Sequence, residues 1–224
     1  LLFEKGMVLE QRLSREADAI TTWGTCLALE PEDITLLCQL EQLFSEKGDH
    51  KSLVAVQRLI ARVVTDEAAK AHYLTSAGLL LEDRVKDLPA AAACFREAFA
   101  LDRRDSLLLA AMKRVAQREN TVDEELAALA AEAEGQGVHA APTFLQISKA
   151  YERLARPEDA LAALVAARRI APNDPLVLSE LGRIFEGQGR YEELADVLLS
   201  WVGAISDESE MVAINLRLGS LFED

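Results

Sequence analysis

The sequence predicts an all-α protein, a right-handed α-solenoid in which helical hairpins stack side by side. Three observations support this prediction: self-similarity at spacings of 34 to 38 residues, apolar residues at helical intervals, and no alternation of the kind that β-strands show. Half of the 224 residues are apolar, which is sufficient for a packed core. We therefore expect one solenoid over residues 1–224, with six helical hairpins and one unpaired C-terminal helix.

Internal repeats become visible when the sequence is shifted against itself. A shift of 72 residues, two repeat units, superimposes Gly6 on Gly78 and Trp23 on Phe95. A shift of 34 residues places Phe144 on Leu178, Ile147 on Leu181, Ser148 on Gly182, Tyr151 on Phe185 and Leu164 on Leu198. The small residues expected to let the two helices of a hairpin approach closely are Gly6, Gly78, Gly182 and Gly219. The aromatic residues expected to fill the space between hairpins are Trp23, Tyr151 and Phe185.

Helix ends are predicted from capping residues and from the positions of proline. Asp174 followed by Pro175 is typical of an N-cap and a first helical residue, and Thr121 with Glu124 predicts a capping box. The six prolines all fit helix starts or turns, so none has to interrupt a helix. Residues expected to adopt the left-handed conformation at helix ends are Gly48, Asn120 and Gly189.

These signals predict thirteen helices joined by short turns. Within the helices, apolar residues recur at steps of three and four and form one stripe. No long linker rich in proline, glycine or serine separates them, and the weakest joint lies around Gly135 and Gly137. The expected helices cover residues 1–13, 15–29, 33–47, 50–63, 66–84, 87–101, 105–118, 122–134, 139–154, 157–170, 174–188, 191–204 and 208–223.

Composition argues against several classes of function. The chain has 24 Lys and Arg against 38 Asp and Glu, a net charge of −14, so nucleic acid is not expected as a partner. Its longest apolar stretches, such as Leu88 to Phe95, are too short for membrane insertion. The cysteines Cys26, Cys38 and Cys94 follow no metal-binding spacing, so we expect buried free thiols, no metal site and no cofactor.

The sequence also lacks the motifs of common enzymes. It contains no GxSxG, no phosphate-binding GxxxxGK and no HExxH. Neighbouring acids such as Glu192 and Glu193 lie early in expected helices, where a carboxylate stabilises the helix N-terminus. We therefore expect that the chain is not an enzyme.

The best-defined repeat, residues 141–174, resembles the tetratricopeptide repeat, whose unit is about 34 residues long. The matching positions are Phe144, Ile147, Ser148 and Tyr151 on the first helix, and Ala160, Leu164, Ala167 and Pro172 on the second helix and turn. The next repeat departs from the pattern, because Leu194 and Trp201 stand where small residues are usual. The repeats at Gly6 and Gly78 contain one extra residue and look like the longer hairpins of bacterial repeat proteins.

By resemblance to this family, the first helices of the repeats line a concave groove that receives a peptide. The positions expected to line it in the second and third repeats are Gln42, Ser45, Glu46, His72, Thr75, Leu79, Glu82 and Asp83. In later repeats basic residues follow: Arg114, Arg118, Lys149, Arg153 and Arg183. These five residues, the basic strip, are candidate contacts for an acidic peptide or a C-terminal carboxylate, because an arginine fork binds a carboxylate with two hydrogen bonds.

A second interpretation of the basic strip is that each cation pairs with an acid one turn away, as Lys149 could with Glu152. Exposed pairs of this kind stabilise a protein by only about 0 to 1 kcal/mol each. The family's clamp for chaperone tails uses Lys and Asn four residues apart on the first helix, and no KxxxN occurs here. A chaperone tail is therefore not the expected ligand.

The sequence thus predicts a non-catalytic protein-interaction scaffold, a fragment of a longer bacterial protein located in the cytoplasm. One alternative is an architectural spacer or self-association element without a discrete ligand, which an exposed apolar helix over Met211 to Phe222 would favour. Another is the substrate-presenting arm of an enzyme whose catalytic domain lies elsewhere. A periplasmic location stays open, because the sequence begins as if within a helix.

Overall fold

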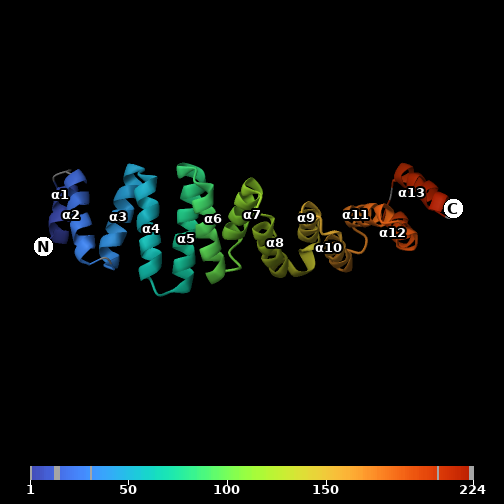
Figure 1. Cartoon of the computed structure of the whole chain (residues 1–224), viewed down its shortest axis with the longest axis horizontal. Coiled ribbons are helices and arrows are strands. Elements are labelled where there is room, and N and C mark those ends of the chain that lie inside the picture. The colour runs from blue at the N-terminus through green and yellow to red at the C-terminus, as the bar shows by residue number, and fades with distance from the viewer. Residues whose placement is uncertain (1, 13–15, 31, 206, 222–224) are drawn as a thin grey trace. The chain divides into compact units, whose positions relative to one another are not determined.

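The described chain consists of helices and turns, which confirms the predicted all-α fold of helical hairpins. The computed structural model describes residues 2–12, 16–30, 32–205 and 207–221. These residues form the α-helices α1 to α13, a π-helical turn η1 and a 3₁₀ turn η2, and no strand occurs among them (Figure 1). Contacts group the helices into two compact units, unit 1 (Leu1–Asn120) and unit 2 (Thr121–Asp224).

Unit 1 contains three hairpins and a seventh helix. The hairpins are α1 with α2, α3 with α4, and α5 with α6, and each packs on the next, while α7 packs on α6. The bounds are α1 Leu2–Gln11, α2 Glu16–Leu29, α3 Ile34–Lys47, α4 His50–Val63, α5 Glu67–Leu80, η1 Leu81–Val85, α6 Leu88–Leu101 and α7 Ser106–Glu119.

Unit 2 begins with α8, which packs on the hairpin of α9 and α10, followed by the hairpin of α11 and α12 and by α13. We refer to odd-numbered helices as first helices and to even-numbered ones as second helices. The bounds are α8 Val122–Gln136, η2 Gly137–His139, α9 Ala141–Arg153, α10 Pro157–Ile170, α11 Pro175–Gly187, α12 Tyr191–Ala204 and α13 Glu208–Leu221. The expectation of a single solenoid over residues 1–224 concerns both units and stays a prediction.

The predicted helix boundaries agree with the observed ones to within two residues, with one exception. The helix expected over 66–84 ends as an α-helix at Leu80 and continues as η1. The backbone N–H of Lys86 then donates to the carbonyl of Leu81, and Lys86 adopts a left-handed φ of 64°. A π-helical turn holds one residue more than an α-helical turn, so η1 takes up the extra residue of this longer hairpin.

Aspartate side chains cap helices in both units. In unit 1 the caps that accept hydrogen bonds from backbone N–H groups of the following helix are Asp33, Asp49, Asp66, Asp87 and Asp105. In unit 2 the predicted cap Asp174 is confirmed, whereas the predicted capping box at Thr121 is wrong because its side chain makes no cap hydrogen bond. The first turn of α8 instead carries three acidic residues that stabilise the helix N-terminus. The predicted left-handed residues are confirmed at Gly48, Asn120 and Gly189.

Two hairpins of unit 1 close on a glycine that is covered by an aromatic ring. Trp23 of α2 lies against Gly6 of α1, where a Cβ atom would stand 2.0 Å from Nε1 of the indole. Phe95 of α6 covers Gly78 of α5 in the same way, with its Cε1 atom 2.4 Å from the place of a Cβ. Both rings are buried, so the glycines permit the close approach that the sequence predicts.

The glycines predicted to act in the same way in unit 2 have more room. At Gly182 a Cβ would meet only Cδ1 of Leu194, at an ordinary contact distance of 3.6 Å. At Gly219, apart from the adjoining residues and the backbone of its own helix, no atom of the described residues lies within 4 Å of that place. The prediction of a close approach is therefore only weakly met at Gly182, and it stays a prediction at Gly219, because no second helix follows α13 among the described residues.

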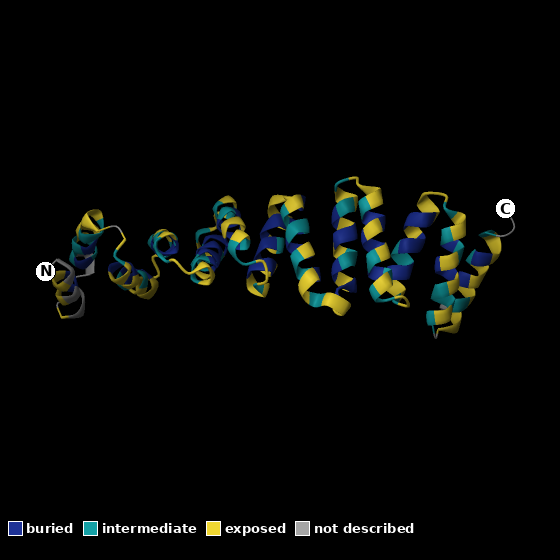
Figure 2. Cartoon of the chain, turned by 90° about the horizontal axis from the view of Figure 1, so that it is seen from below, coloured by how far each residue is buried: buried dark blue, intermediate teal, exposed yellow. Residues whose placement is uncertain are grey.

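Buried side chains lie on the helix faces that turn toward neighbouring helices (Figure 2). In unit 1 a cluster of such residues includes Trp23, Leu37 and Ile60. In unit 2 a large cluster surrounds Leu181 and Leu198. A smaller cluster in unit 2 consists of Leu129, Ala133, Ala140, Ile147 and Ala163. The helices therefore share apolar surface with their immediate neighbours within each unit.

The three free thiols differ in burial. Cys94 is buried and Cys26 is partly buried, but Cys38 is exposed, so the expectation of three buried thiols is wrong for Cys38. The apolar stripe of α3 runs through Leu37 and Leu40, and Cys38 lies beside this stripe on the solvent side. Partial desolvation and the negative charge of Glu41 raise the pKa of the Cys38 thiol.

Candidate interaction surface

All five residues of the basic strip lie on first helices with exposed side chains. Arg114 and Arg118 are one turn apart on α7 in unit 1, and Lys149 and Arg153 on α9 and Arg183 on α11 belong to unit 2. Each cation already binds a carboxylate of the chain. The geometry of these ion pairs therefore decides what else the surface can bind.

In unit 1 two arginines share one buried carboxylate. The side chain of Glu82 in η1 is 1% exposed, whereas those of Arg114 and Arg118 are 46% and 52% exposed. Arg114 donates from Nε to one carboxylate oxygen at 2.6 Å and from Nη2 to the other at 2.5 Å. Nη1 of Arg118 donates to the first of these oxygens at 3.1 Å. The resulting two-pronged contact needs the planar fork of an arginine, which lysine does not have.

The electrostatics of this cluster follow from its burial. Hydrogen bonds from Arg114 hold the pKa of Glu82 below its ordinary value, burial opposes this, and the charges of Arg114, Arg118 and Lys86 lower it further. The hydrogen bond with Glu82 also raises the pKa of Arg114. A carboxylate removed from water needs such partners to stay charged. Two guanidinium groups on one carboxylate leave this cluster with a net positive charge.

A second buried carboxylate binds a cation of the strip in unit 2. Nη2 of Arg153 on α9 donates to Glu125 of α8, whose side chain is buried. This pair joins a second helix to the first helix that follows it. One cation and one carboxylate cancel, so the pair adds no net charge to the surface.

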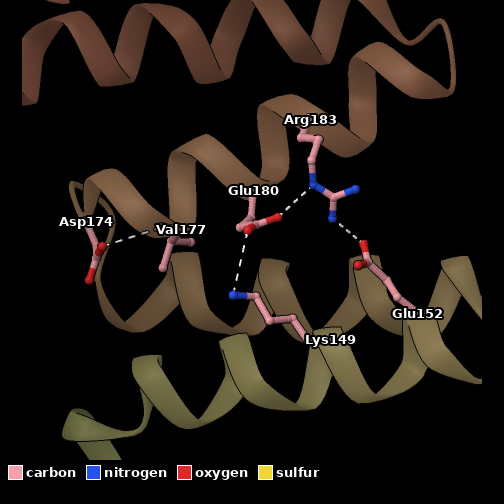
Figure 3. A network of polar contacts seen from close by, with 6 residues as sticks. All are labelled: Lys149, Glu152, Asp174, Val177, Glu180 and Arg183. Carbon is pink, nitrogen blue, oxygen red and sulfur yellow. Dashed lines mark hydrogen bonds and ion pairs between the residues drawn. The ribbon is translucent and has the colours of Figure 1, made fainter.

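A network of four charged residues joins α9 to α11 (Figure 3). Nε of Arg183 donates at 2.8 Å to Glu180 on its own helix, and Nη2 donates to Glu152 of α9. Both hydrogen bonds raise the pKa of Arg183. Nζ of Lys149 lies 3.9 Å from Oε1 of Glu180, which is a looser contact. Because two cations face two carboxylates, the network is also neutral.

Sequence reasoning missed most of these carboxylates. The second interpretation placed an acid one turn from each cation, which is correct for Arg183 with Glu180. Its named example is wrong, because Lys149 pairs with Glu180 and not with Glu152. The other pairs join residues 28 to 36 positions apart, close to one repeat: Arg114 and Arg118 with Glu82, Arg153 with Glu125, Lys149 with Glu180, Arg183 with Glu152, and Arg217 with Glu186. Acids and cations spaced near the repeat period are the signal that could have found them.

Two of the residues expected to line the groove are not on the surface. Glu82 and Thr75 are both buried. Thr75 lies one residue after the buried Leu74 and thus falls within the packed face of α5. Glu82 is drawn inward because η1 continues the helix beyond α5 and places its carboxylate against α7.

The described residues provide neither a metal site nor a membrane-spanning helix. No group of three or more His, Cys, Asp or Glu side chains in the described ranges could hold a metal ion. Among those same residues, no helix combines the length and the apolar character needed to cross a bilayer. The expected cytoplasmic location stays a prediction.

The chain matches no protein-family model and no curated protein. Solved structures similar to it include MamA, with 15% identity and a TM-score of 0.45 over 72% of this chain and 91% of MamA. PilF of Pseudomonas aeruginosa is 16% identical, with a TM-score of 0.44 over 84% of this chain and 83% of PilF. YrrB, described as a TPR protein with an unusual peptide-binding site, is 19% identical, with a TM-score of 0.43 over 80% of this chain and 89% of YrrB.

Proposed function

We propose that the chain is a non-catalytic scaffold for protein–protein interaction and that an acidic partner segment binds its first helices at the basic strip. The observation that supports this most is the cluster around Glu82. Two exposed arginines there share one buried carboxylate, which leaves an excess of positive charge within a chain whose net charge is −14. An acidic segment is the partner that such a local excess attracts.

The ion pairs of this cluster orient the arginines without using all their donors. A guanidinium group has five N–H donors, and Glu82 accepts from two nitrogens of Arg114 and one of Arg118. Within the described part of the chain the Nε and Nη2 atoms of Arg118 donate to no other residue. A second carboxylate would form charge-assisted hydrogen bonds with them. Because the side chains are already held in place, less conformational entropy is lost on binding.

The cations of unit 2 support the same proposal less strongly. Lys149, Arg153 and Arg183 are proposed contacts for the rest of the partner segment. An acidic partner would have to compete with Glu152 and Glu180 for these cations, because their pairs are neutral. Most of the affinity should therefore come from Arg114 and Arg118.

A peptide titration tests the proposal. A fluorescein-labelled Asp/Glu-rich peptide with a free C-terminal carboxylate is titrated with the full chain, and binding is followed by fluorescence anisotropy. Arg118→Gln should weaken binding about tenfold, since a charge-assisted hydrogen bond contributes about 1.5 to 3 kcal/mol. Arg114 keeps Glu82 paired in this variant, which protects the fold.

The matched control is Arg62→Gln, which removes an exposed arginine from the second helix α4. It should leave the affinity for the peptide unchanged, although it changes the net charge by the same amount. If wild type does not bind the peptide, or if Arg118→Gln binds it as tightly as wild type, the basic strip is not an acidic-peptide site.

An architectural role is the second candidate, supported by two specific observations. The ion pairs link successive repeats, as Arg217 of α13 does with Glu186 of α11. In α13, Val212 and Leu216 are 58% and 71% exposed and lie one turn apart, an apolar surface that could stack on another copy; Phe222 lies outside the described residues. Light scattering on the same samples distinguishes the roles: self-association that Leu216→Ser prevents, without peptide binding, supports the architectural role.

A further inference from the structure

A groove of about 450 Å³ lies within unit 2 and is lined by α8, α9 and α10. From α9 it receives the large apolar side chains of Phe144, Ile147 and Tyr151, whereas the apolar lining from α8 and α10 consists of Leu126 and five alanines. A concave, mostly apolar surface of this size is in the range of binding sites. It is flanked by second helices, whereas the basic strip lies on first helices.

The groove exists because small residues replace a polar bridge at this interface. One interface further along, between α10 and α12, Nη2 of Arg168 donates to Oγ of Ser200 at 2.9 Å. In the repeat alignment these residues correspond to Ala133 and Ala166, 35 and 34 positions earlier, and both alanines line the groove. The side chains of Arg168 and Ser200 meet between α10 and α12. The methyl groups of Ala133 and Ala166 are too short to meet between α8 and α10, so space remains there.

The apolar side chains beneath the alanines remain partly exposed. Phe144 and Tyr151 are half-buried, whereas Leu178 and Phe185, which occupy the same repeat positions in α11, are buried. The cluster under the groove is the small one around Ile147, and Phe144 packs against both this cluster and the large cluster of unit 2. The expectation that Tyr151 fills the space between hairpins is therefore only partly met, and its ring offers contact area to a partner.

The charge at the rim of the groove is negative. Its two charged lining residues are Glu134 and Asp159. Asp159 binds Arg156, whose guanidinium stacks 5.0 Å from the centre of the Tyr151 ring, so the negative charge without a cation at the rim is that of Glu134. Glu134 is exposed and forms no hydrogen bond or ion pair with the described part of the chain.

The surrounding unit reinforces this charge. Unit 2 carries 8 Lys and Arg against 19 Asp and Glu, a net charge of −11, whereas unit 1 carries 16 against 19, a net charge of −3. The negative electrostatic potential around unit 2 attracts basic partners to the groove and disfavours acidic ones there. The groove thus combines an apolar centre with an acidic rim.

We propose that this groove binds an amphipathic helix of a partner protein whose apolar face is flanked by a lysine or arginine. Such a helix anchors by side chains at positions i, i+3 or i+4 and i+7, which would cover Phe144, Ile147 and Tyr151. The basic side chain would pair with Glu134 at the rim. This inference is independent of the acidic-peptide site, because it concerns other side chains and a partner of the opposite charge; on α9, which the two surfaces share, the groove uses Phe144, Ile147 and Tyr151.

Filling the groove tests the apolar part of the proposal. The probe is a labelled 14-residue helical peptide with leucines at positions i, i+3, i+4 and i+7 and lysines beside them, titrated with the full chain. Ala162 is exposed and lines the groove, so Ala162→Leu occupies the space without disturbing the core. This variant should weaken binding at least about tenfold. Ala55→Leu, at an exposed alanine of the second helix α4, is the matched control and should bind as wild type does.

Reversing the rim charge tests the polar part. Glu134→Lys should weaken binding of the lysine-containing peptide about fivefold and improve binding of a version in which glutamates replace the lysines. Glu192→Lys reverses one negative charge in the same way, at an exposed position of α12. It should leave the affinity for both peptides nearly unchanged, because it alters only the overall charge of unit 2.

Three results would overturn the proposal. One is that wild type fails to bind the amphipathic peptide. Another is that Ala162→Leu and Glu134→Lys bind it as tightly as their controls do. The third is concentration-dependent dimerisation of wild type that Ala162→Leu abolishes, because the groove would then receive a second copy of the chain.

Discussion

One hairpin in each unit begins from the same sequence feature, a glycine on the first helix, yet the two hairpins close differently. In unit 1, Phe95 of α6 covers Gly78 so closely that a Cβ would fall 2.4 Å from a ring atom. In unit 2, Leu194 of α12 faces Gly182, and a Cβ would lie 3.6 Å from its nearest neighbour. The glycine is sterically required in the first hairpin and only tolerated in the second.

This difference shows that the residue on the second helix decides how the small residue on the first helix is used. An aromatic ring that packs against the backbone of a helix leaves no room for a Cβ, whereas a branched aliphatic side chain lies at an ordinary contact distance from it. The groove of unit 2 is a further variation, because alanines on both second helices leave space unfilled. One repeat pattern thus permits three arrangements. They are a tight joint at Gly78 and Phe95, an ordinary joint at Gly182 and Leu194, and an open groove at Ala133 and Ala166.

The largest expected effect comes from adding a methyl group to the tight joint. Gly78→Ala should lower the free energy of unfolding by about 3 kcal/mol, because three atoms of the buried Phe95 ring lie under 3.0 Å from the new Cβ. Urea denaturation followed by circular dichroism measures this loss. Alkylation of Cys94, which is buried next to Phe95 in α6, should become faster in the variant.

A second substitution should convert the tight joint into the ordinary one. In the Gly78→Ala background, Phe95→Leu places a leucine opposite the new Cβ, as Leu194 lies opposite residue 182, and should recover part of the lost stability. A double-mutant cycle would give a coupling free energy of about 1 kcal/mol or more between the two positions. Purely additive effects would mean that the ring contact is not the cause.

The next largest effect concerns the buried carboxylate of unit 1. Glu82→Gln should cost about 2 kcal/mol at pH 7, reduced from the value for fully buried pairs because both arginine partners are half-exposed. Glu186→Gln, which breaks the exposed pair with Arg217 in unit 2, should cost about 0.5 kcal/mol or less. Equal losses in the two variants would contradict the difference in burial.

The stabilising effect of the Glu82 charge should depend on pH. Since the folded chain lowers the pKa of this carboxyl group, its contribution is fully present above the ordinary glutamate pKa of about 4.3 and is lost as the pH falls through the lowered value. Denaturation curves of wild type and Glu82→Gln measured from pH 7 to pH 3 should therefore converge only below about pH 4. A constant difference across this range would rule out the charge as the cause.

The smallest effect has the opposite sign. Gly182→Ala should raise the free energy of unfolding by up to about 1 kcal/mol, because alanine favours the helix and its Cβ meets Leu194 at 3.6 Å. The same urea denaturation experiment measures it. A loss as large as that of Gly78→Ala would show that the two joints are equally tight.

Most of the fold could be predicted from the sequence, but only part of the candidate site could. Helix ends follow from neighbouring residues, as at Asp174 and Asn120, and these predictions are confirmed. The cations of the basic strip were identified, but the carboxylates that bind most of them were not, because Glu82 and Glu125 lie about one repeat from their partners. The groove at Ala133 was missed entirely, since an alanine in a helix gives no sign of what faces it.

The sequence by itself determined the helices, their order and the small and aromatic residues of each hairpin, because helical periodicity and capping depend on residues a few positions apart. The tertiary structure alone decided which glycine is tightly packed, which carboxylate each arginine binds and where unfilled space remains. Those features arise between side chains on neighbouring helices, and their outcome depends on the volumes and charges of both partners at each contact.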